Sequence, residues 1–153
     1  MVQNNRDPKD VNRRLLPSPG KAKGRPRILI AEDDDEMRTL LARVLYGDGY
    51  AVAECRDGID LFQRIEPFVV REVPLDFDAI VSDICMPGLT GLEILEDLHD
   101  RAGFPPVILI TAFGDKGIHA RAERAGVAAM LDKPFGIDEL LAKLHKIVSR
   151  QPA

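Results

Sequence analysis

Short apolar runs alternate with amphipathic stretches along the chain from residue 27 onward. This alternation is typical of strand–helix units whose strands form a parallel sheet. Five such units can be distinguished, and their strands are predicted at residues 27–31, 51–55, 78–83, 107–111 and 128–131. The first, third and fourth runs are almost unbroken apolar segments, which indicates strands covered by helices on both faces of the sheet.

Helices are predicted where apolar residues recur three and four positions apart. In the first helix the residues that would share one face are Met37, Leu40, Leu41, Val44 and Leu45, and Gly47 and Gly49 should end it. The middle helix has Leu92, Leu95 and Leu98, and the last has Ile137, Leu140, Leu141, Leu144 and Ile147. The fourth helix, residues 116–125, is weakly apolar, with Ile118, Ala122 and Ala125 as its inner stripe. It is therefore either mobile or an ordinary Ala-rich surface helix.

These elements predict an α/β fold, a doubly wound sheet of five parallel strands joined by right-handed crossovers. In sheets of this kind the functional crevice lies outside the carboxyl ends of the strands. Residues at the ends of the predicted strands are therefore the first candidates for chemistry.

Composition predicts one folded domain behind a basic tail. A chain of 153 residues with 45% hydrophobic and 30% charged residues fits a single core. Residues 1–27 carry a net charge of +6 and residues 28–153 carry −10. We expect residues 1–26 to be disordered and residues 27–150 to form the domain. The tail has no aromatic side chain to stack on bases, so a solvated leader is favoured over a nucleic-acid-binding segment.

The apolar runs are far shorter than the ~18 residues that a membrane span requires, so no membrane association is expected. The only two cysteines are Cys55 and Cys85, which is too few for a disulfide framework. The basic residues near the N-terminus are not followed by the apolar segment of a secretion signal. A cytoplasmic location is expected.

Charged and hydroxyl side chains gather at the predicted carboxyl ends. Glu32 and Asp33 follow the first strand, and Asp83 ends the third, which should lie beside it. Three carboxylates this close repel one another unless a cation or a proton compensates them. No His or Cys pair has metal-binding spacing, so the oxygen-rich set favours Mg²⁺ over zinc. The next three acidic residues, Asp34 to Glu36, are better explained as the cap and first turn of a helix.

Two further residues complete the candidate site, Thr111 at the end of the fourth strand and Lys133 just after the fifth. A carboxylate beside Mg²⁺, with a hydroxyl and an ammonium group nearby, is suited to accepting a phosphoryl group. With these motifs in this order, residues 27–150 resemble the receiver domain of bacterial two-component response regulators, which has a flavodoxin-like fold. The segments 111–115 (TAFGD) and 132–135 (DKPF) are most similar to receivers of the nitrogen-regulator type.

The resemblance implies a role for each candidate residue. Asp83 would be phosphorylated from the phosphohistidine of a sensor histidine kinase or a histidine phosphotransfer protein. Asp33 and Asp83 would bind Mg²⁺ directly, Glu32 through a water molecule, and Cys85 through its main-chain carbonyl. Thr111 would hydrogen-bond the phosphoryl group, Lys133 would pair with Asp83 and then with the phosphate, and the Lys133–Pro134 bond would be cis. Such a domain is a signalling module in a phosphorelay, and its only chemistry is its own phosphorylation and dephosphorylation.

The chain departs from the family pattern in two places. On the fifth strand Met130 stands where the family has Tyr or Phe, whose ring moves together with the threonine, here Thr111, during switching. The usual switch is therefore in doubt, and an adaptor that binds partners without a phosphorylation switch is the alternative. The stretch between Gly58 and Asp83 is several residues longer than usual. It is interpreted as a longer helix and a packed loop, with an apolar partner surface as the alternative.

Only three residues follow the last predicted helix, so a stand-alone response regulator that docks onto a downstream protein is expected. A homodimer through the fourth helix, fifth strand and fifth helix is a further expectation from the resemblance. Two enzyme classes fit the residues less well. A flavin phosphate would need a Gly- or Ser/Thr-rich cradle after the first strand, where acids stand instead. A haloacid-dehalogenase-type phosphatase would need Asp at the position of Cys85.

Overall fold

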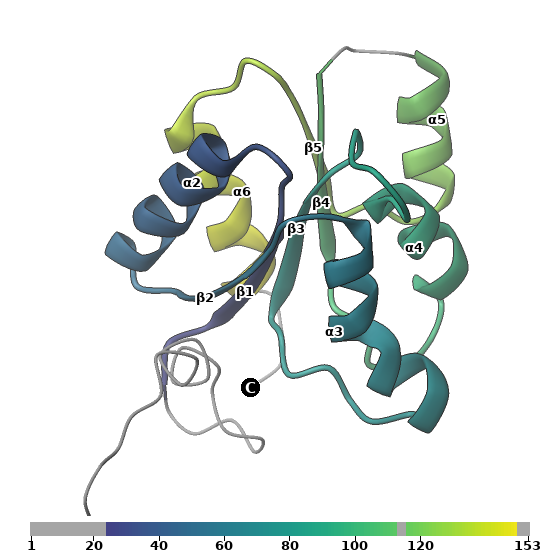
Figure 1. The fold of residues 1–153 in the computed structure, drawn as a ribbon. Coiled ribbons are helices and arrows are strands. Elements are labelled where there is room, and N and C mark those ends of the chain that lie inside the picture. Colours follow the sequence, from purple (N-terminus) through teal and green to yellow (C-terminus); the bar gives the residue numbers. More distant parts are fainter. Residues whose placement is uncertain (1–23, 113–115, 150–153) are drawn as a thin grey trace, which may run out of the picture.

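In this computed structural model, which describes residues 24–112 and 116–149, five parallel strands form one sheet (Figure 1). Their order in the sheet is β2–β1–β3–β4–β5. The strands are β1 (Arg27–Ala31), β2 (Ala51–Cys55), β3 (Ala79–Asp83), β4 (Val107–Thr111) and β5 (Ala129–Asp132). The helices between and after them are α2 (Asp35–Gly47), α3 (Gly58–Arg71), α4 (Gly91–Leu98), α5 (Lys116–Arg124) and α6 (Ile137–Ser149). The predicted doubly wound sheet is confirmed, with each strand within one residue of its predicted bounds.

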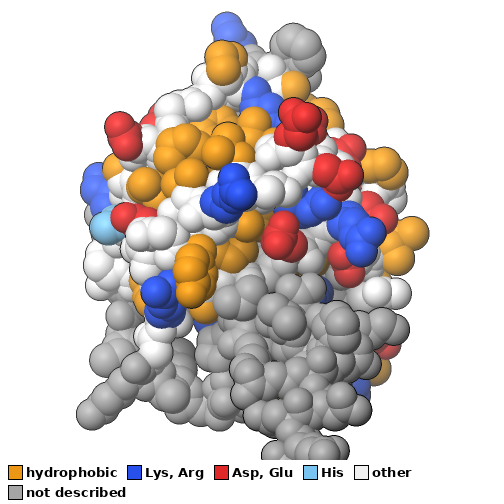
Figure 2. Space-filling model, turned by 60° about the vertical axis from the view of Figure 1, so that its left-hand side comes forward, with side chains coloured by type: hydrophobic (Ala, Val, Ile, Leu, Met, Phe, Trp, Pro, Cys, Tyr) orange, Lys and Arg blue, Asp and Glu red, His pale blue; other side chains and the backbone are white. Residues whose placement is uncertain are grey.

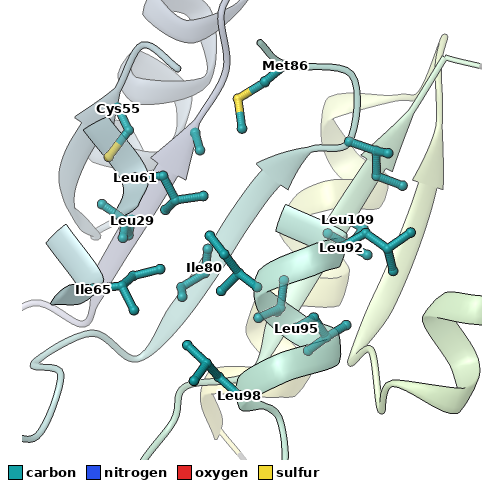
Figure 3. Close-up of a cluster of buried hydrophobic side chains, with 14 of the residues drawn as sticks. Leu29, Cys55, Leu61, Ile65, Ile80, Met86, Leu92, Leu95, Leu98 and Leu109 are labelled. Carbon is teal, nitrogen blue, oxygen red and sulfur yellow. The ribbon is translucent and has the colours of Figure 1, made fainter. Parts of the chain in front are cut away.

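Helices cover both faces of the sheet, α2 and α6 on one side and α3, α4 and α5 on the other (Figure 1). Successive strand residues point to opposite faces, so each strand contributes to two clusters of buried side chains. One cluster joins strand residues such as Ile28 and Ile110 to Leu41 on α2 and Leu144 on α6. The other contains Leu29, Ile80 and Leu109 from the strands together with leucines of α3 and α4 (Figure 3). Burial on both faces explains why the strands read as continuous apolar runs.

The first helix begins as its sequence predicts. The carboxylate of Asp34 caps α2 by accepting a hydrogen bond from the Met37 N–H at 2.9 Å. Asp35 and Glu36 lie in the first turn, where acidic side chains complement the helix dipole. The interpretation of these three residues as helix-start residues is confirmed.

The predicted apolar face of α2 is wrong at one position. Leu41 and Leu45 are buried, but Leu40 is 46% exposed, and Arg38 is buried on the inward side. A guanidinium can take an inward position when its N–H groups find acceptors, and Arg38 has acceptors on the neighbouring loop and strand. The spacing of apolar residues does not reveal such a charged member.

The longer stretch after Gly58 forms a helix and a packed loop. Helix α3 runs to Arg71, Phe68 is buried, and Leu75 and Phe77 pack against the buried cluster. Arg27 holds this loop, because its Nη1 lies 2.8 Å from the Asp76 carboxylate and its guanidinium stacks 4.8 Å from the Phe77 ring centre. The predicted longer helix and packed loop are thus confirmed, while Val70 and Val73 of the same stretch are exposed, so an apolar partner surface stays the alternative.

Most of the predicted basic tail, residues 1–23, lies outside the described residues, so its disorder stays a prediction. The last three residues of the predicted tail, 24–26, are described. The Pro26 carbonyl accepts a hydrogen bond of 2.8 Å from the Ala51 N–H. Arg25 stacks 4.4 Å from the centre of the Tyr46 ring. Within the described ranges, no helix has both the length and the apolar character needed to cross a membrane.

Candidate phosphorylation and metal site

Three carboxylates meet where β1 and β3 end side by side. The register pairs Ala31 with Ser82, so the residues that follow, Glu32 and Asp83, come out at the same edge of the sheet. Together with Asp33 they offer oxygen atoms that all lie within 4.8 Å of one another. Glu32 is only 1% exposed and Asp83 3%, whereas Asp33 is exposed. The predicted acidic cluster is thus present at the carboxyl ends of the strands.

Lys133 reaches into this cluster from the loop after β5. Its Nζ lies 2.7 Å from Asp83 Oδ2 and 3.5 Å from Glu32 Oε2. The Lys133 main chain is fixed because its N–H donates a 2.7 Å hydrogen bond to the Thr111 carbonyl. The Lys133–Pro134 peptide bond is cis, as the resemblance implied. The structure therefore brings Lys133 to the side chain with which it was predicted to pair.

The Asp83 carboxylate is held on both of its oxygens. Oδ2 accepts from Lys133, and Oδ1 accepts a 2.8 Å hydrogen bond from the backbone N–H of Cys85. Thr111 is 2% exposed at the end of β4, the strand next to β3. The side chain of Asp83 is thus oriented before any ligand arrives, which is the condition for catalysis by positioning.

The acidic cluster is short of positive charge. Burial raises the pKa of Glu32 to about 7, and a hydrogen bond to Asp83 and the negative charge of Asp83 act in the same direction. Burial alone would lower the pKa of Lys133, but its hydrogen bonds to Asp83 and Glu32 and their charges raise it overall. One ammonium therefore serves three carboxylates, and a divalent cation would relieve the remaining repulsion.

The donor set fits Mg²⁺ on chemical grounds. All three candidate side chains offer hard carboxylate oxygens, the ligands that Mg²⁺ prefers. Within the described part of the chain, this is the only cluster of three or more His, Cys, Asp or Glu side chains close enough to share an ion. The three side chains of this cluster, Glu32, Asp33 and Asp83, are the carboxylates that the sequence predicted as metal ligands.

A glycine fixes the loop that carries Cys85 against the start of α3. A Cβ atom built on Gly58 would lie 2.0 Å from the carbonyl oxygen of Leu89, so only glycine permits this approach. The Gly58 N–H also donates a 3.2 Å hydrogen bond to the Pro87 carbonyl. The loop after β3 is therefore supported by backbone contacts next to the candidate phosphorylation site.

Of the residues expected to take part in switching, the structure describes Thr111 and Met130. Met130 lies on β5, is partly buried, and packs against the cluster beneath α3, α4 and α5. Residues 113–115, which follow Thr111 closely, lie outside the described residues. The two cysteines differ, because Cys55 is buried and burial raises the pKa of its thiol to about 12, whereas Cys85 is exposed. Cys55 is therefore an unreactive core residue.

Sequence reasoning missed Arg38, a buried residue beside the acidic cluster. Its Nη1 donates a 2.9 Å hydrogen bond to the main-chain carbonyl of Glu32. Arg38 stands in an amphipathic helix where a charged residue is normally assigned to the solvent side. The only signal that could have suggested its position is its spacing from the acidic residues at the start of α2, since Arg38 follows Asp35 by about one turn of the helix.

Comparison with known proteins establishes the family. The sequence model of the family described as the response regulator receiver domain matches residues 28–145 of this chain. The chain belongs to this family. The receiver is 34% identical to the transcriptional regulatory protein TcrA of Mycobacterium tuberculosis over 137 residues, which is 88% of this chain and 51% of TcrA. It is also 34% identical to the transcriptional regulatory protein FixJ of Azorhizobium caulinodans over 121 residues, 79% of this chain and 54% of FixJ. The chain thus spans about half the length of these relatives.

Solved structures agree with this assignment. A CheY-like response regulator receiver domain from Methanospirillum hungatei superposes with a TM-score of 0.72 and 25% identity, covering 82% of this receiver and 95% of that chain. The receiver domain of the Francisella response regulator 1452 superposes with a TM-score of 0.69 and 26% identity, covering 82% and 98%. Receiver domains are signalling modules rather than enzymes, so the chain is assigned to signal transduction.

Proposed function

We propose that this receiver accepts a phosphoryl group on Asp83 from the phosphohistidine of a histidine kinase or histidine phosphotransfer protein, in a reaction that needs Mg²⁺. The observation that carries the proposal is the placement of Asp83, whose two oxygens are held by Lys133 and the Cys85 N–H beside two further carboxylates. Membership of the receiver family supplies the class of phosphodonor.

In the proposed transfer, a carboxylate oxygen of Asp83 forms a bond to phosphorus as the bond to the donor histidine nitrogen breaks. The histidine nitrogen keeps the electron pair of the broken bond. Asp33, Asp83 and the Cys85 carbonyl would hold Mg²⁺ directly and Glu32 through water, and the bound ion would supply positive charge for the phosphoryl oxygens. Lys133 would supply a second positive charge, and the Thr111 hydroxyl would donate a hydrogen bond to the phosphoryl group.

A partner that delivers the phosphoryl group needs a surface next to this site. Asp33 leads directly into α2, on which Leu40 is 46% exposed, and Pro134 beside Lys133 is exposed as well. Figure 2 turns the α2 and α6 side forward and shows hydrophobic side chains gathered among charged ones. Exposed apolar side chains on the helix that follows Asp33 and beside Lys133 support docking of a protein partner.

The output remains part of the proposal. Docking onto a downstream protein, with a dimer through α5, β5 and α6, is the expected form of signalling. Met130 offers neither a ring nor a hydroxyl to follow Thr111, which keeps the adaptor without a phosphorylation switch as the second candidate. We also propose that the protein acts as a single domain in the cytoplasm. The mass of the native protein in cell extracts and the subcellular fraction in which it is found would test this.

Phosphorylation by acetyl phosphate tests the proposal. Wild-type protein incubated with acetyl phosphate and Mg²⁺ should gain the mass of one phosphoryl group, and addition of EDTA should prevent the gain. Asp83→Asn should gain nothing, because an amide oxygen cannot form the acyl phosphate.

Asp100→Asn is the matched control, since Asp100 is an exposed aspartate in the turn after α4. This variant should be phosphorylated like the wild type. If the wild type stays unmodified while remaining folded, the phosphoryl-acceptor proposal fails and the adaptor is favoured.

A further inference from the structure

A buried arginine holds the segment that carries two of the proposed metal ligands. Arg38 lies on α2 and is 9% exposed, although its guanidinium carries a full charge. Burial of a charge is costly unless hydrogen bonds and countercharges compensate it. The hydrogen bonds and ion pairs of Arg38 must therefore compensate this buried charge.

Three groups from different parts of the chain surround the guanidinium. Nη1 donates a 2.9 Å hydrogen bond to the main-chain carbonyl of Glu32. Nη2 bonds the carboxylate of Asp35, one turn earlier on α2. Nε lies 3.6 Å from the carboxylate of Glu54 on β2. Arg38 thus links the loop after β1 to a helix and to an edge strand.

The carbonyl that Arg38 grips belongs to the peptide group between Glu32 and Asp33. On the other side of the same residue, the Glu32 N–H donates a 3.1 Å hydrogen bond to the Cys55 carbonyl on β2. The Glu32 main chain is therefore fixed at both its N–H and its carbonyl. With this peptide fixed, the directions in which the Glu32 and Asp33 side chains leave the backbone are also set.

The countercharges of Arg38 lie outside the ligand set. Its ion pairs are with Asp35 and Glu54, whereas Lys133 pairs with Asp83 and Glu32. Arg38 contacts the acidic cluster through a backbone carbonyl and leaves the ligand carboxylates to the metal. This division of contacts points to orientation rather than charge neutralisation as its contribution.

We propose that Arg38 is a positioning residue for the magnesium site, holding the Glu32–Asp33 peptide so that both carboxylates face Asp83. This inference rests on the proposed function only in requiring that Mg²⁺ binds at these carboxylates. Loss of such supporting contacts in metal sites lowers metal affinity by about 10- to 100-fold.

A charge effect of Arg38 and a positioning role of Arg38 predict opposite changes in Mg²⁺ affinity when the arginine is replaced. Removing a positive charge near a cation site should by itself strengthen Mg²⁺ binding. If Arg38 positions the ligands, Arg38→Met should instead weaken binding by about 10-fold or more. Arg43→Met is the matched control, since Arg43 is exposed on the same helix and its loss changes the net charge equally. It should bind Mg²⁺ as tightly as the wild type or slightly more tightly.

The measurement is the Mg²⁺ dissociation constant, obtained by titration calorimetry or from amide NMR shifts without any phosphodonor. Circular dichroism establishes that each variant is folded, and Arg38→Gln replaces Arg38→Met if the latter does not fold. Unchanged or tighter Mg²⁺ binding in a folded Arg38 variant would overturn the positioning role. If the wild type itself bound no Mg²⁺, the metal-dependent function would fail instead, so the two failures are distinguishable.

Discussion

The surroundings of Glu32 oppose the negative charge of its carboxylate. This residue is almost fully buried, and burial together with the nearby Asp83 raises its pKa from 4.5 to about 7. Between these two values the unfolded chain has lost this proton while the folded chain keeps it. The folded state is therefore favoured less and less as the pH rises through this interval.

The expected result is a pH-dependent stability in the absence of divalent cations. In EDTA, the free energy of unfolding of the wild type should fall by about 1 to 3 kcal/mol between about pH 5 and pH 8 relative to Glu32→Gln. Urea unfolding at several pH values measures the difference. Parallel stability curves for the two proteins would mean that Glu32 titrates normally in the folded protein.

At this scale the sequence predicted the residues that directly follow apolar runs. Glu32, Asp83 and Lys133 could be assigned to one edge because parallel strands all end there. Arg38 could not be assigned, because its role depends on a single hydrogen bond to a main-chain carbonyl. A one-dimensional pattern carries no information on which carbonyl a long side chain reaches.

Among the elements, α3 and the loop after β3 are joined by a contact that tolerates no side chain. A Cβ atom at Gly58 would lie 2.0 Å from the Leu89 carbonyl oxygen and 2.6 Å from the Leu89 nitrogen. Neither atom can move without shifting the loop that follows Asp83. The beginning of α3 is therefore fixed by the backbone of another element.

Gly58→Ala should lower the free energy of unfolding by about 2 kcal/mol or more, because the backbone must shift to admit the methyl group. Gly47→Ala is the matched control, since no atom lies within 4 Å of its Cβ position at the end of α2. That change should alter stability by less than about 1 kcal/mol, in the stabilising direction. Equal effects in urea unfolding would show that the Gly58 contact is not tight.

Strand bounds were predictable to within one residue, because strands buried on both faces have few polar interruptions. Helix faces were less predictable. Leu40 belongs to the apolar spacing of α2 and yet is exposed, while Arg38 takes an inward position. The length of α3, which continues past Pro67 to Arg71, is likewise set by packing of Phe68 and the following loop rather than by local signals.

For the whole molecule, the sheet separates two layers of helices, and the acidic site lies at the carboxyl ends of its strands. One layer consists of α2, which carries Arg38, and α6, whereas Met130 of β5 packs against the cluster under the other layer. Lys133 pairs with Asp83, and its N–H donates a hydrogen bond to the Thr111 carbonyl at the end of β4, the strand beside β5. A change at Asp83 therefore has direct contacts through which it can reach the β5 edge of the sheet.

The most direct test of the central claim is to locate the phosphoryl group chemically. Borohydride reduces an acyl phosphate to an alcohol, which marks the modified residue for peptide mass spectrometry. After incubation with acetyl phosphate, the mark is expected at Asp83, with Mg²⁺ present and not in EDTA. A mark on another residue, or an equal mark at Asp83 without any divalent cation, would contradict the account.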